Sequence, residues 1–516
     1  MSEKMKYTET HYVTEYEPNR QAIVELKNGR FADVINGCFF ASGMRVLIQG
    51  TKIVAMPNLQ SEPKPDYSID LRGKTAIPGL LNTHCHVNRN MPLNYTFKGM
   101  YLQRRYGEQQ IRRNLSECLS HGITYLRDAL SDDLASTQAL RHYFEREPGP
   151  RILQSVGVSP VGSGLAPYTS FAARTAIKIV MGGIDHNSSR SGIMVFPVDA
   201  SESQVRDAVD RAIDERGAEA IKIVEQRVNM FTLKPDWTIM TMGQLRALAD
   251  QARKRGLQTL MHQGTVESFR RAVEAGVSSI SHMTCDDDLT REDVEAFIAS
   301  GCVIESTLSV AYDFCWKFEG DPLQHHPNME RLSEYRTNEK PIADIAEEFY
   351  IPELREAICN LHERYSQGNF KVLGLADMGK FFRFGNVFVS HGIGNLRKLH
   401  QWGATIALAN DGSALTCTLP MLGLELALFN LFLNQEPGET IFSGADALRI
   451  ATINSARSMG LGDRFGTLEV GKTADIAIVD GNPFEDYQVI GSRVAALFMD
   501  GRLVINNCAL KVGRES

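Results

Sequence analysis

Long hydrophobic runs, basic clusters and an apolar leader are all missing from this chain of 516 residues. No stretch approaches the ~18 uninterrupted apolar residues that a membrane-spanning helix needs, so we expect no membrane partner. There is no run of five or more basic residues, and the formal net charge of −7 is mild, which argues against nucleic acid as a partner. Residues 1–10 contain no apolar core of the signal-peptide type.

A regular cysteine framework is also missing. The nine cysteines are scattered and odd in number, which favours reduced thiols and a cytoplasmic location over a disulfide scaffold. No low-complexity linker divides the chain. Its composition, 43% hydrophobic and 23% charged, is that of an ordinary globular protein. The length fits one large α/β barrel with a smaller companion domain.

What the chain does contain is a recurring unit of a helix, a glycine and a short apolar strand. The glycine suits the left-handed position that ends a helix, and apolar strands are typical of parallel strands covered on both faces. Eight such strands predict a (β/α)8 TIM-type barrel, which eight units fit better than a doubly wound sheet. The expected strands begin near Ala76, Gly122, Gly149, Gly217, Gly256, Gly276, Gly301 and Gly403.

The two ends of the chain carry short strand-like pieces separated by turns. Because neither end can bury a sheet face alone, we expect them to form one small composite β-sandwich. The predicted limits are 1–76 and 458–516 for the two parts of the sandwich and 77–457 for the barrel.

A long segment, about 309–400, interrupts the barrel rhythm after the seventh strand. An insertion there falls on the C-terminal face of the barrel, where active sites are built, so it either shapes the substrate pocket or makes an oligomer contact. Its aromatic residues hint at a bulky apolar substrate, although they could equally pack the insertion itself; they include Tyr312, Phe314, Trp316 and Phe318.

Two histidines follow the first expected strand. His84 and His86 are two residues apart, so on a strand both rings point to the same side and can reach one metal ion. Three further metal-binding side chains close later strands: His262 the fifth, His282 the sixth and Asp411 the eighth. The repetition at strand ends is what turns a common pair into a candidate metal site.

Lys222 lies inside the fourth expected strand, Ala220-Ile-Lys-Ile-Val224. A buried parallel strand is a poor place for an unpaired ammonium group. If the amine takes up CO2, the resulting carbamate is anionic and its two oxygens can bridge two metal ions ~3.5–4 Å apart. The alternative is a lysine at the strand rim, paired with a carboxylate such as Glu225.

The remaining histidines carry weaker signals. His121 precedes its strand and therefore belongs on the opposite, N-terminal face of the barrel, where we interpret it as structural. His391, His186 and Tyr312 are candidate substrate contacts.

Taken together, these residues resemble the amidohydrolase superfamily of metal-dependent hydrolases. The resemblance rests on Pro78-Gly-Leu-Leu-Asn-Thr-His84-Cys-His86, on the strand-end residues named above, and on the C-terminal run that begins at Gly466. Gly217-Ala-Glu-Ala-Ile-Lys222-Ile is similar to the imidazolonepropionase/prolidase-like branch with a carboxylated lysine. That branch includes Xaa-Pro and Xaa-Arg dipeptidases and ochratoxinase-type amidases. Asn410, Ser281 and the length of the insertion depart from the usual pattern and leave the substrate open.

The resemblance implies a binuclear centre. His84, His86 and Asp411 would hold one divalent cation, most simply Zn2+, and His262 and His282 a second. Carbamylated Lys222 and a hydroxide would bridge the two. Asp411 would carry a proton to the leaving amine, so that a small-molecule amide is hydrolysed at its C–N bond. A homo-oligomer is expected on the same ground.

Three other functions stay open at this point. Deaminases of aminated heterocycles in this superfamily use a Glu close after the strand-five histidine, whereas here Gln263 follows His262 and no Glu occurs before Glu267. Lactonases and phosphotriesterases share the same metal core. A non-enzymatic scaffold protein is disfavoured because every expected ligand is present.

Overall fold

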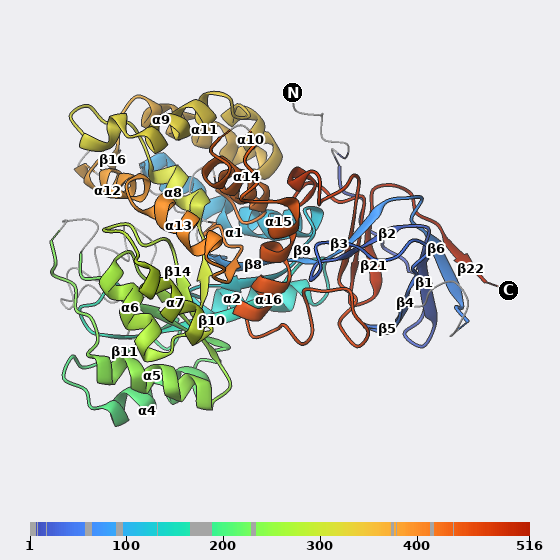
Figure 1. Ribbon diagram of the computed structural model, residues 1–516, viewed down its shortest axis with the longest axis horizontal. Coiled ribbons are helices and arrows are strands. Elements are labelled where there is room, and N and C mark those ends of the chain that lie inside the picture. Colours follow the sequence, from blue (N-terminus) through green and yellow to red (C-terminus); the bar gives the residue numbers. More distant parts are fainter. Residues whose placement is uncertain are drawn as a thin grey trace.

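The computed structural model describes the chain except for a few short stretches. Those stretches are residues 1–6, 8, 17, 57–63, 89–95, 132, 166–187, 229–233, 373–375, 378, 413–416, 437 and 516. Figure 1 shows a large lobe, in which strands are surrounded by helices, beside a smaller lobe built from strands. None of the helices within the described ranges is long and apolar enough to cross a membrane.

The large lobe is an eight-stranded parallel barrel, as predicted, and its strands follow one another in chain order. The barrel closes between its first and last strands: Thr83 N donates to Leu408 O (3.1 Å), and Asp411 N donates to His84 O (2.8 Å). The strands are β8 (Leu80–Cys85), β9 (Ile123–Asp128), β10 (Arg151–Pro160), β12 (Ala220–Val224), β13 (Gln258–His262), β14 (Ser279–Ser281), β15 (Val303–Glu305) and β18 (Ile406–Ala407). A short strand, β11 (Ile193–Phe196), pairs with β10 outside this path.

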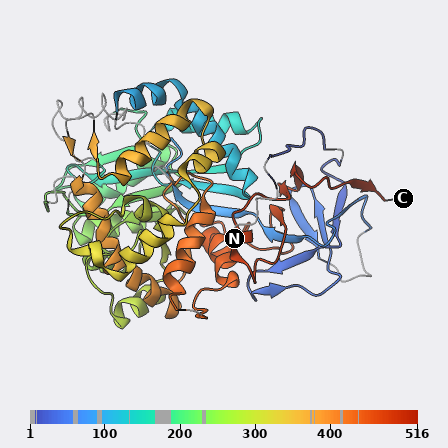
Figure 2. The same cartoon turned by 90° about the horizontal axis from the view of Figure 1, so that it is seen from above.

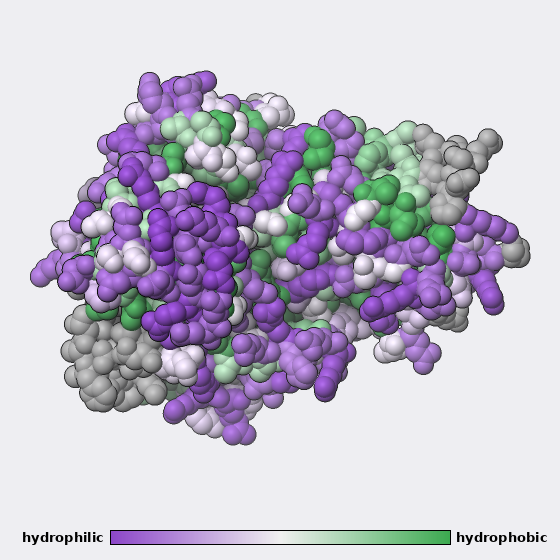
Figure 3. Space-filling view, turned by 90° about the horizontal axis from the view of Figure 1, so that it is seen from below, coloured by the Kyte–Doolittle hydropathy of each residue, from purple (hydrophilic) through white to green (hydrophobic). Residues whose placement is uncertain are grey.

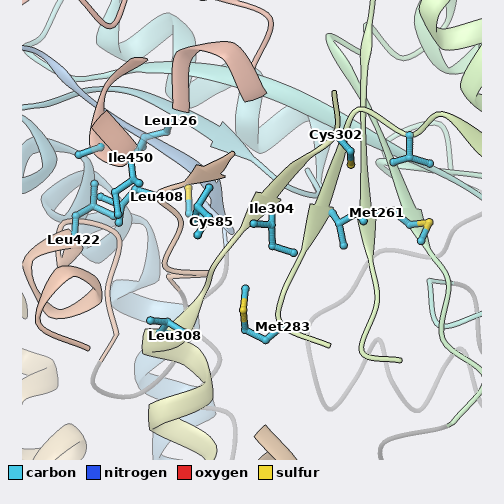
Figure 4. Close-up of a cluster of buried hydrophobic side chains, with 14 of the residues drawn as sticks. Cys85, Leu126, Met261, Met283, Cys302, Ile304, Leu308, Leu408, Leu422 and Ile450 are labelled. Atoms are coloured by element: carbon cyan, nitrogen blue, oxygen red, sulfur yellow. The ribbon is translucent and has the colours of Figure 1, made fainter. Parts of the chain in front are cut away.

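Helices alternate with these strands. Ser201, Thr241 and Thr290 each form the expected capping box with the residue three positions on, because both side chains satisfy backbone N–H groups that the first turn leaves free. The helices outside the insertion are α1 (Phe97–Ser120), α2 (Leu134–Phe144), α4 (Glu202–Asp214), α5 (Met242–Lys254), α6 (Val266–Ala275), α7 (Arg291–Ser300), α14 (Leu422–Leu433), α15 (Gly444–Ala451) and α16 (Ile453–Ser458). Figure 4 shows part of the core they cover, with Cys85, Met261 and Ile304 carried by barrel strands.

The first expected strand is in fact two strands, which is a correction to the sequence prediction. The strand β7 (Thr75–Pro78) pairs with the β-rich lobe, whereas β8 belongs to the barrel. Gly79 separates them at a close approach, since a Cβ atom there would lie 2.6 Å from Thr124 Oγ1. A continuous apolar run therefore passes from one sheet into another.

The smaller lobe is the predicted composite of both ends of the chain, and in Figure 2 its strands carry the colours of the first and last residues. One sheet has the order β21-β20-β19-β7-β2-β3 and the other β22-β6-β1-β4-β5. Leu26, Ile69 and Phe498 belong to their common hydrophobic core. The bounds are β1 (Ile23–Lys27), β2 (Arg30–Asp33), β3 (Cys38–Phe39), β4 (Val46–Gln49), β5 (Lys52–Ala55), β6 (Tyr67–Asp70), β19 (Ile476–Val479), β20 (Ala496–Met499), β21 (Arg502–Asn506) and β22 (Val512–Arg514).

The insertion after β15 is a helical cap with a core of its own. Trp316, Phe349 and Phe382 pack together in that core, and Figure 1 shows the cap helices above the barrel. The elements are α8 (Leu308–Phe314), η2 (Pro322–His325), α9 (Pro327–Thr337), α10 (Ile342–Phe349), α11 (Pro352–Ser366), β16 (Lys371–Val372), β17 (Ala376–Asp377), α12 (Gly379–Gly385), η3 (Asn386–Val389) and α13 (Gly392–Gln401).

On the face drawn in Figure 3, hydrophilic side chains cover most of the barrel lobe and hydrophobic ones form smaller separate patches.

Candidate metal centre

One cavity of about 600 Å3 collects the six residues that the sequence singled out. Five of them stand at or just beyond the C-terminal ends of β8, β13, β14 and β18, which a closed parallel barrel brings to one face, and Lys222 lies in the middle of β12. All of them line the cavity: His84, His86, Lys222, His262, His282 and Asp411.

His84, His86 and Asp411 form what we call the first half of the centre. Asp411 Oδ1 lies 3.1 Å from His86 Nε2 and 3.5 Å from His84 Nε2, and one ligand atom of each residue falls within 4.8 Å of the others. Within the described residues, Asp411 Oδ1 accepts no well-aligned hydrogen bond although it is buried. Three electron-pair donors that converge in this way suit a divalent cation between them.

His262 and His282 form the second half. Their ring centroids lie 4.5 Å apart, and the His282 ring lies 5.1 Å from that of His84. His262 Nε2 lies 2.5 Å from Gln226 Oε1, and His282 Nδ1 lies 2.7 Å from Thr307 Oγ1. Each imidazole is thus anchored through one nitrogen, which leaves the other available as a ligand.

Lys222 lies beside the first half and lines the same cavity as the second. Its side chain is buried in the barrel, and its Nζ lies 3.4 Å from His84 Nε2. The carboxylate that we considered as its alternative partner, Glu225, accepts from Arg271 Nη2 at 3.1 Å. Lys222 thus contacts a histidine of the first half.

Burial keeps three imidazoles of the centre neutral, those of His84, His262 and His282. It lowers the pKa of His84 to about 3 and that of His282 to about 3, and it lowers the pKa of His262 well below its usual value. Burial alone would raise the pKa of Asp411, but the contact with His86 and the nearby imidazoles outweigh it and lower that pKa. Neutral imidazoles and an ionised carboxylate are the protonation states that bind metal.

An ion pair that the sequence did not predict lies behind His84. His84 Nδ1 lies 2.9 Å from Ser281 Oγ and 3.5 Å from Glu305 Oε2. Glu305 in turn pairs with Arg127 and accepts from Ser458 Oγ at 2.7 Å, with the Arg127 and Glu305 side chains fully buried. Burial would raise the pKa of Glu305, but Arg127 outweighs it and lowers that pKa. The signal in the sequence was a charged residue at the end of each of two apolar strands.

Three non-glycine residues of the centre have left-handed backbones: His282 (φ 72°), Thr307 (φ 54°) and Asp411 (φ 50°). This region is unfavourable for residues with a Cβ atom and occurs where surrounding contacts hold the chain. All three directly follow barrel strands or the turns after them. The rim of the barrel around the centre is therefore one place where the fold holds unfavourable backbone.

The insertion supplies much of the cavity wall. Phe314, Phe382 and Phe388 line it from the cap, and Trp237 and Leu165 line it from barrel loops. Of the two functions weighed for the insertion, shaping the pocket is the one with structural support. A largely apolar wall around a few polar groups is typical of a small-molecule site.

The candidate substrate contacts differ in whether they line the cavity. His391 lines the cavity near its mouth, where its Nδ1 lies 3.1 Å from Asp288 Oδ1. The structure does not bring Tyr312 to the cavity: its ring is buried in the cap and its hydroxyl donates to Glu339. His186 lies outside the described residues. His121 bonds the backbone of its own helix, as expected of a structural histidine.

Comparison with family models gives a match over most of the chain. A sequence model of the Amidohydrolase family matches residues 75–504. Among curated proteins, the 5-methylthioadenosine/S-adenosylhomocysteine deaminase of Symbiobacterium thermophilum is 27% identical over 131 residues, which cover 23% of this chain and 30% of the deaminase. The chain thus spans less than a third of the length of that relative.

Solved structures resemble the whole fold, among them the following two. A Xaa-Pro dipeptidase with methionine bound in its active site has a TM-score of 0.64 at 19% identity, covering 94% of this chain and 100% of that one. The ochratoxinase of A. niger has a TM-score of 0.65 at 17% identity, covering 94% and 96%. At these identities the likeness concerns the fold.

Proposed function

Because the chain belongs to the amidohydrolase family, we propose that it is a metal-dependent hydrolase that cleaves an amide-type C–N bond through a binuclear centre. One observation carries the proposal: the buried Lys222 Nζ lies 3.4 Å from a neutral histidine nitrogen, in one cavity with two groups of candidate metal-binding side chains. An ammonium group in that place would repel a bound cation, whereas a carbamate would attract one.

The chain's own residues suit this chemistry. A neutral Lys222 amine adds CO2 and loses one proton, which gives an anion with two oxygen donors. His84, His86 and Asp411 would hold one divalent ion, such as Zn2+, and His262 with His282 the other. When bound, the ions would supply a water ionised at neutral pH and would polarise the scissile carbonyl.

Asp411 is the proton carrier in this proposal. Its carboxylate reaches both His84 and His86, and its lowered pKa keeps it ionised and able to take a proton from water. Having accepted that proton, it can pass it to the amine that leaves when the C–N bond breaks. The low pKa makes Asp411 a weak base. It can therefore take up a proton only from a water whose own pKa the bound ions have lowered.

The wall of the cavity supports an apolar acyl or aryl group on the substrate. Phe314, Phe382 and Phe388 offer aromatic faces, which favour flat or bulky apolar groups. N-Acyl amino acids, dipeptides and aryl amides remain the classes to test, with aryl amides expected to be the better substrates.

Replacing Lys222 by alanine tests the centre directly. We expect K222A to fold but to bind little of the second metal and to lose amide hydrolysis, because the bridging anion is gone. Metal analysis and the release of amine from N-acyl amino acids and aryl amides measure the two effects. Short carboxylic acids added to K222A should restore part of the activity by replacing the carbamate.

Lys254, an exposed residue in the last turn of α5, provides the matched control, and K254A should change neither metal content nor activity. Two metal equivalents and full amide hydrolysis in K222A would refute the bridged centre.

A deaminase is the second candidate, favoured by the partial match to curated deaminases. Against it stands the residue after His262: Gln263 lines the cavity and its amide Nε2 donates to His282 O at 3.1 Å, so it cannot relay a proton as a carboxyl group does. Glu267 forms an exposed ion pair with Arg227. Ammonia release from aminated heterocycles, exceeding amine release from amides, would favour the deaminase.

A further inference from the structure

Glu425, on α14, is a fully buried carboxylate outside the proposed metal centre. From the residues that the structure describes, it accepts four hydrogen bonds, all of them from neutral donors of one short segment. The donors are Ser306 Oγ (2.5 Å), Leu308 N (2.7 Å), Ser309 N (2.7 Å) and Ser309 Oγ (2.6 Å). Glu425 thus uses both carboxylate oxygens to bind residues 306–309: one accepts from Ser306 and Leu308, and the other accepts from Ser309.

Thr307 lies in the middle of that segment and makes the contact with the metal centre. Its Oγ1 lies 2.7 Å from His282 Nδ1, and its backbone is left-handed at φ 54°. A β-branched residue disfavours this backbone region, so the segment needs outside contacts to keep it. Glu425 provides them on both sides of Thr307 without touching Thr307 itself.

Hydrophobic packing already joins the two helices concerned. Leu308 at the start of α8 and Leu422 at the start of α14 belong to the same core cluster, and both are labelled in Figure 4. Glu425 is therefore not required to bring the helices together. What it adds is the orientation of the backbone N–H groups, and with it the position of the Thr307 hydroxyl.

We propose that Glu425 is a positioning residue, which fixes the orientation of His282 through the segment 306–309 and so sets the affinity of the second half for metal. The inference rests on the proposed function in one respect, namely that His282 is a ligand. This indirect role of Glu425 differs from that of Glu305, whose carboxylate itself lies close to His84.

The first test compares E425Q with T307V by titration with Co2+. We expect both variants to bind the first equivalent as the wild type does. They should bind the second equivalent 10- to 100-fold more weakly and with an altered visible absorption spectrum, since a loosened histidine changes the geometry around the metal. Because Glu425 acts through Thr307, the double variant E425Q/T307V should bind the second equivalent no more weakly than the single variant with the lower affinity. T307S, which keeps the hydroxyl, should bind as the wild type does.

A purely structural Glu425 predicts a different pattern. E425Q would then lower the melting temperature while the affinity and spectrum of the second Co2+ stay unchanged, and this result would overturn the proposal. E436Q changes an exposed glutamate just after α14 and is the control for a change of charge. If E425Q does not fold, E425D, which keeps the charge but retracts it by one methylene, is expected to show the same selective weakening.

Metal-free crystals separate failure of this proposal from failure of the proposed function. If wild-type protein binds fewer than two metal ions, the binuclear centre is wrong, yet the orientation of His282 can still be compared between wild type and E425Q. A His282 to Thr307 contact that is lost in E425Q supports the positioning role. An unchanged contact refutes it.

Discussion

A buried ion pair lies behind His84, whereas the groups that anchor His262 and His282 are neutral. In the first half of the centre, the Arg127 charge offsets that of Glu305, next to Ser281 and His84. In the second half, an amide from Gln226 and a hydroxyl from Thr307 hold the histidines, and the carboxylate behind Thr307, that of Glu425, has neutral donors throughout the described part of the chain. An ion pair of opposite charges thus supports the first half, whereas neutral hydrogen bonds orient the second. Substitutions in the two halves should therefore have different effects.

The largest effect on stability is expected from Arg127→Met, which removes the cation that pairs with Glu305 behind His84. Glu305 would remain as a buried carboxylate without its cation, and breaking such a pair costs about 3–5 kcal/mol in the free energy of unfolding. Denaturant unfolding measures the loss. The double variant R127M/E305Q, which removes both charges, should recover most of it. Equal destabilisation of the single and double variants would show that the ion pair does not support the first half.

The second prediction concerns pH and separates the halves further. Burial raises the pKa of Glu425 from 4.5 to about 7, so between these values the native protein holds a proton that the unfolded chain releases. Stability should therefore fall as pH rises from 4.5 to 7, by roughly 3 kcal/mol for a shift of this size.

The measurement is the free energy of unfolding of wild type and E425Q across that range, in which E425Q should lack this part of the slope. Identical slopes in the two proteins would contradict the raised pKa.

The smallest effects should come from single anchors. Ser281→Ala removes the hydroxyl beside His84 Nδ1, and Gln226→Leu removes the amide beside His262 Nε2. Each should weaken one metal ion 10- to 100-fold, with S281A acting on the first half and Q226L on the second. Competition with a chelator, followed for each equivalent, resolves the two. Loss of both ions in either variant would mean that the halves are not independent.

Much of the barrel could be predicted because its signals are local. Glycine after each helix, capping boxes such as that of Ser201, and apolar strands of a few residues depend on neighbours in the sequence. The candidate metal-binding residues were found for a similar reason, since five of them stand at or just beyond the end of a strand and closure brings those ends together, while Lys222 stands out as a lysine inside an apolar strand. The family resemblance rested on these residues, and the family match over 75–504 confirms it.

The anchors of the histidines could not be predicted, because they depend on register between strands. Ser281 reaches His84 from β14, and Gln226 reaches His262 from beyond β12. The cap was equally out of reach: Phe388 lines the cavity while Tyr312 is buried, and no short-range pattern separates two aromatic residues in a helical insertion. The break at Gly79 follows from the approach of Thr124, which is remote in sequence.

The composite sandwich has a consequence for the order in which the protein can fold during synthesis. The strand β7, which leads into His84 and His86, pairs with β19, and Thr75 faces Val479 roughly 400 residues later. At about 5–20 residues per second, a ribosome needs some tens of seconds to a minute or more to reach β19 after β7. During that time the barrel can assemble while β7 lacks its C-terminal neighbour. The sandwich is therefore completed last, and its closure fixes β7, the strand directly before the barrel strand β8 that carries His84.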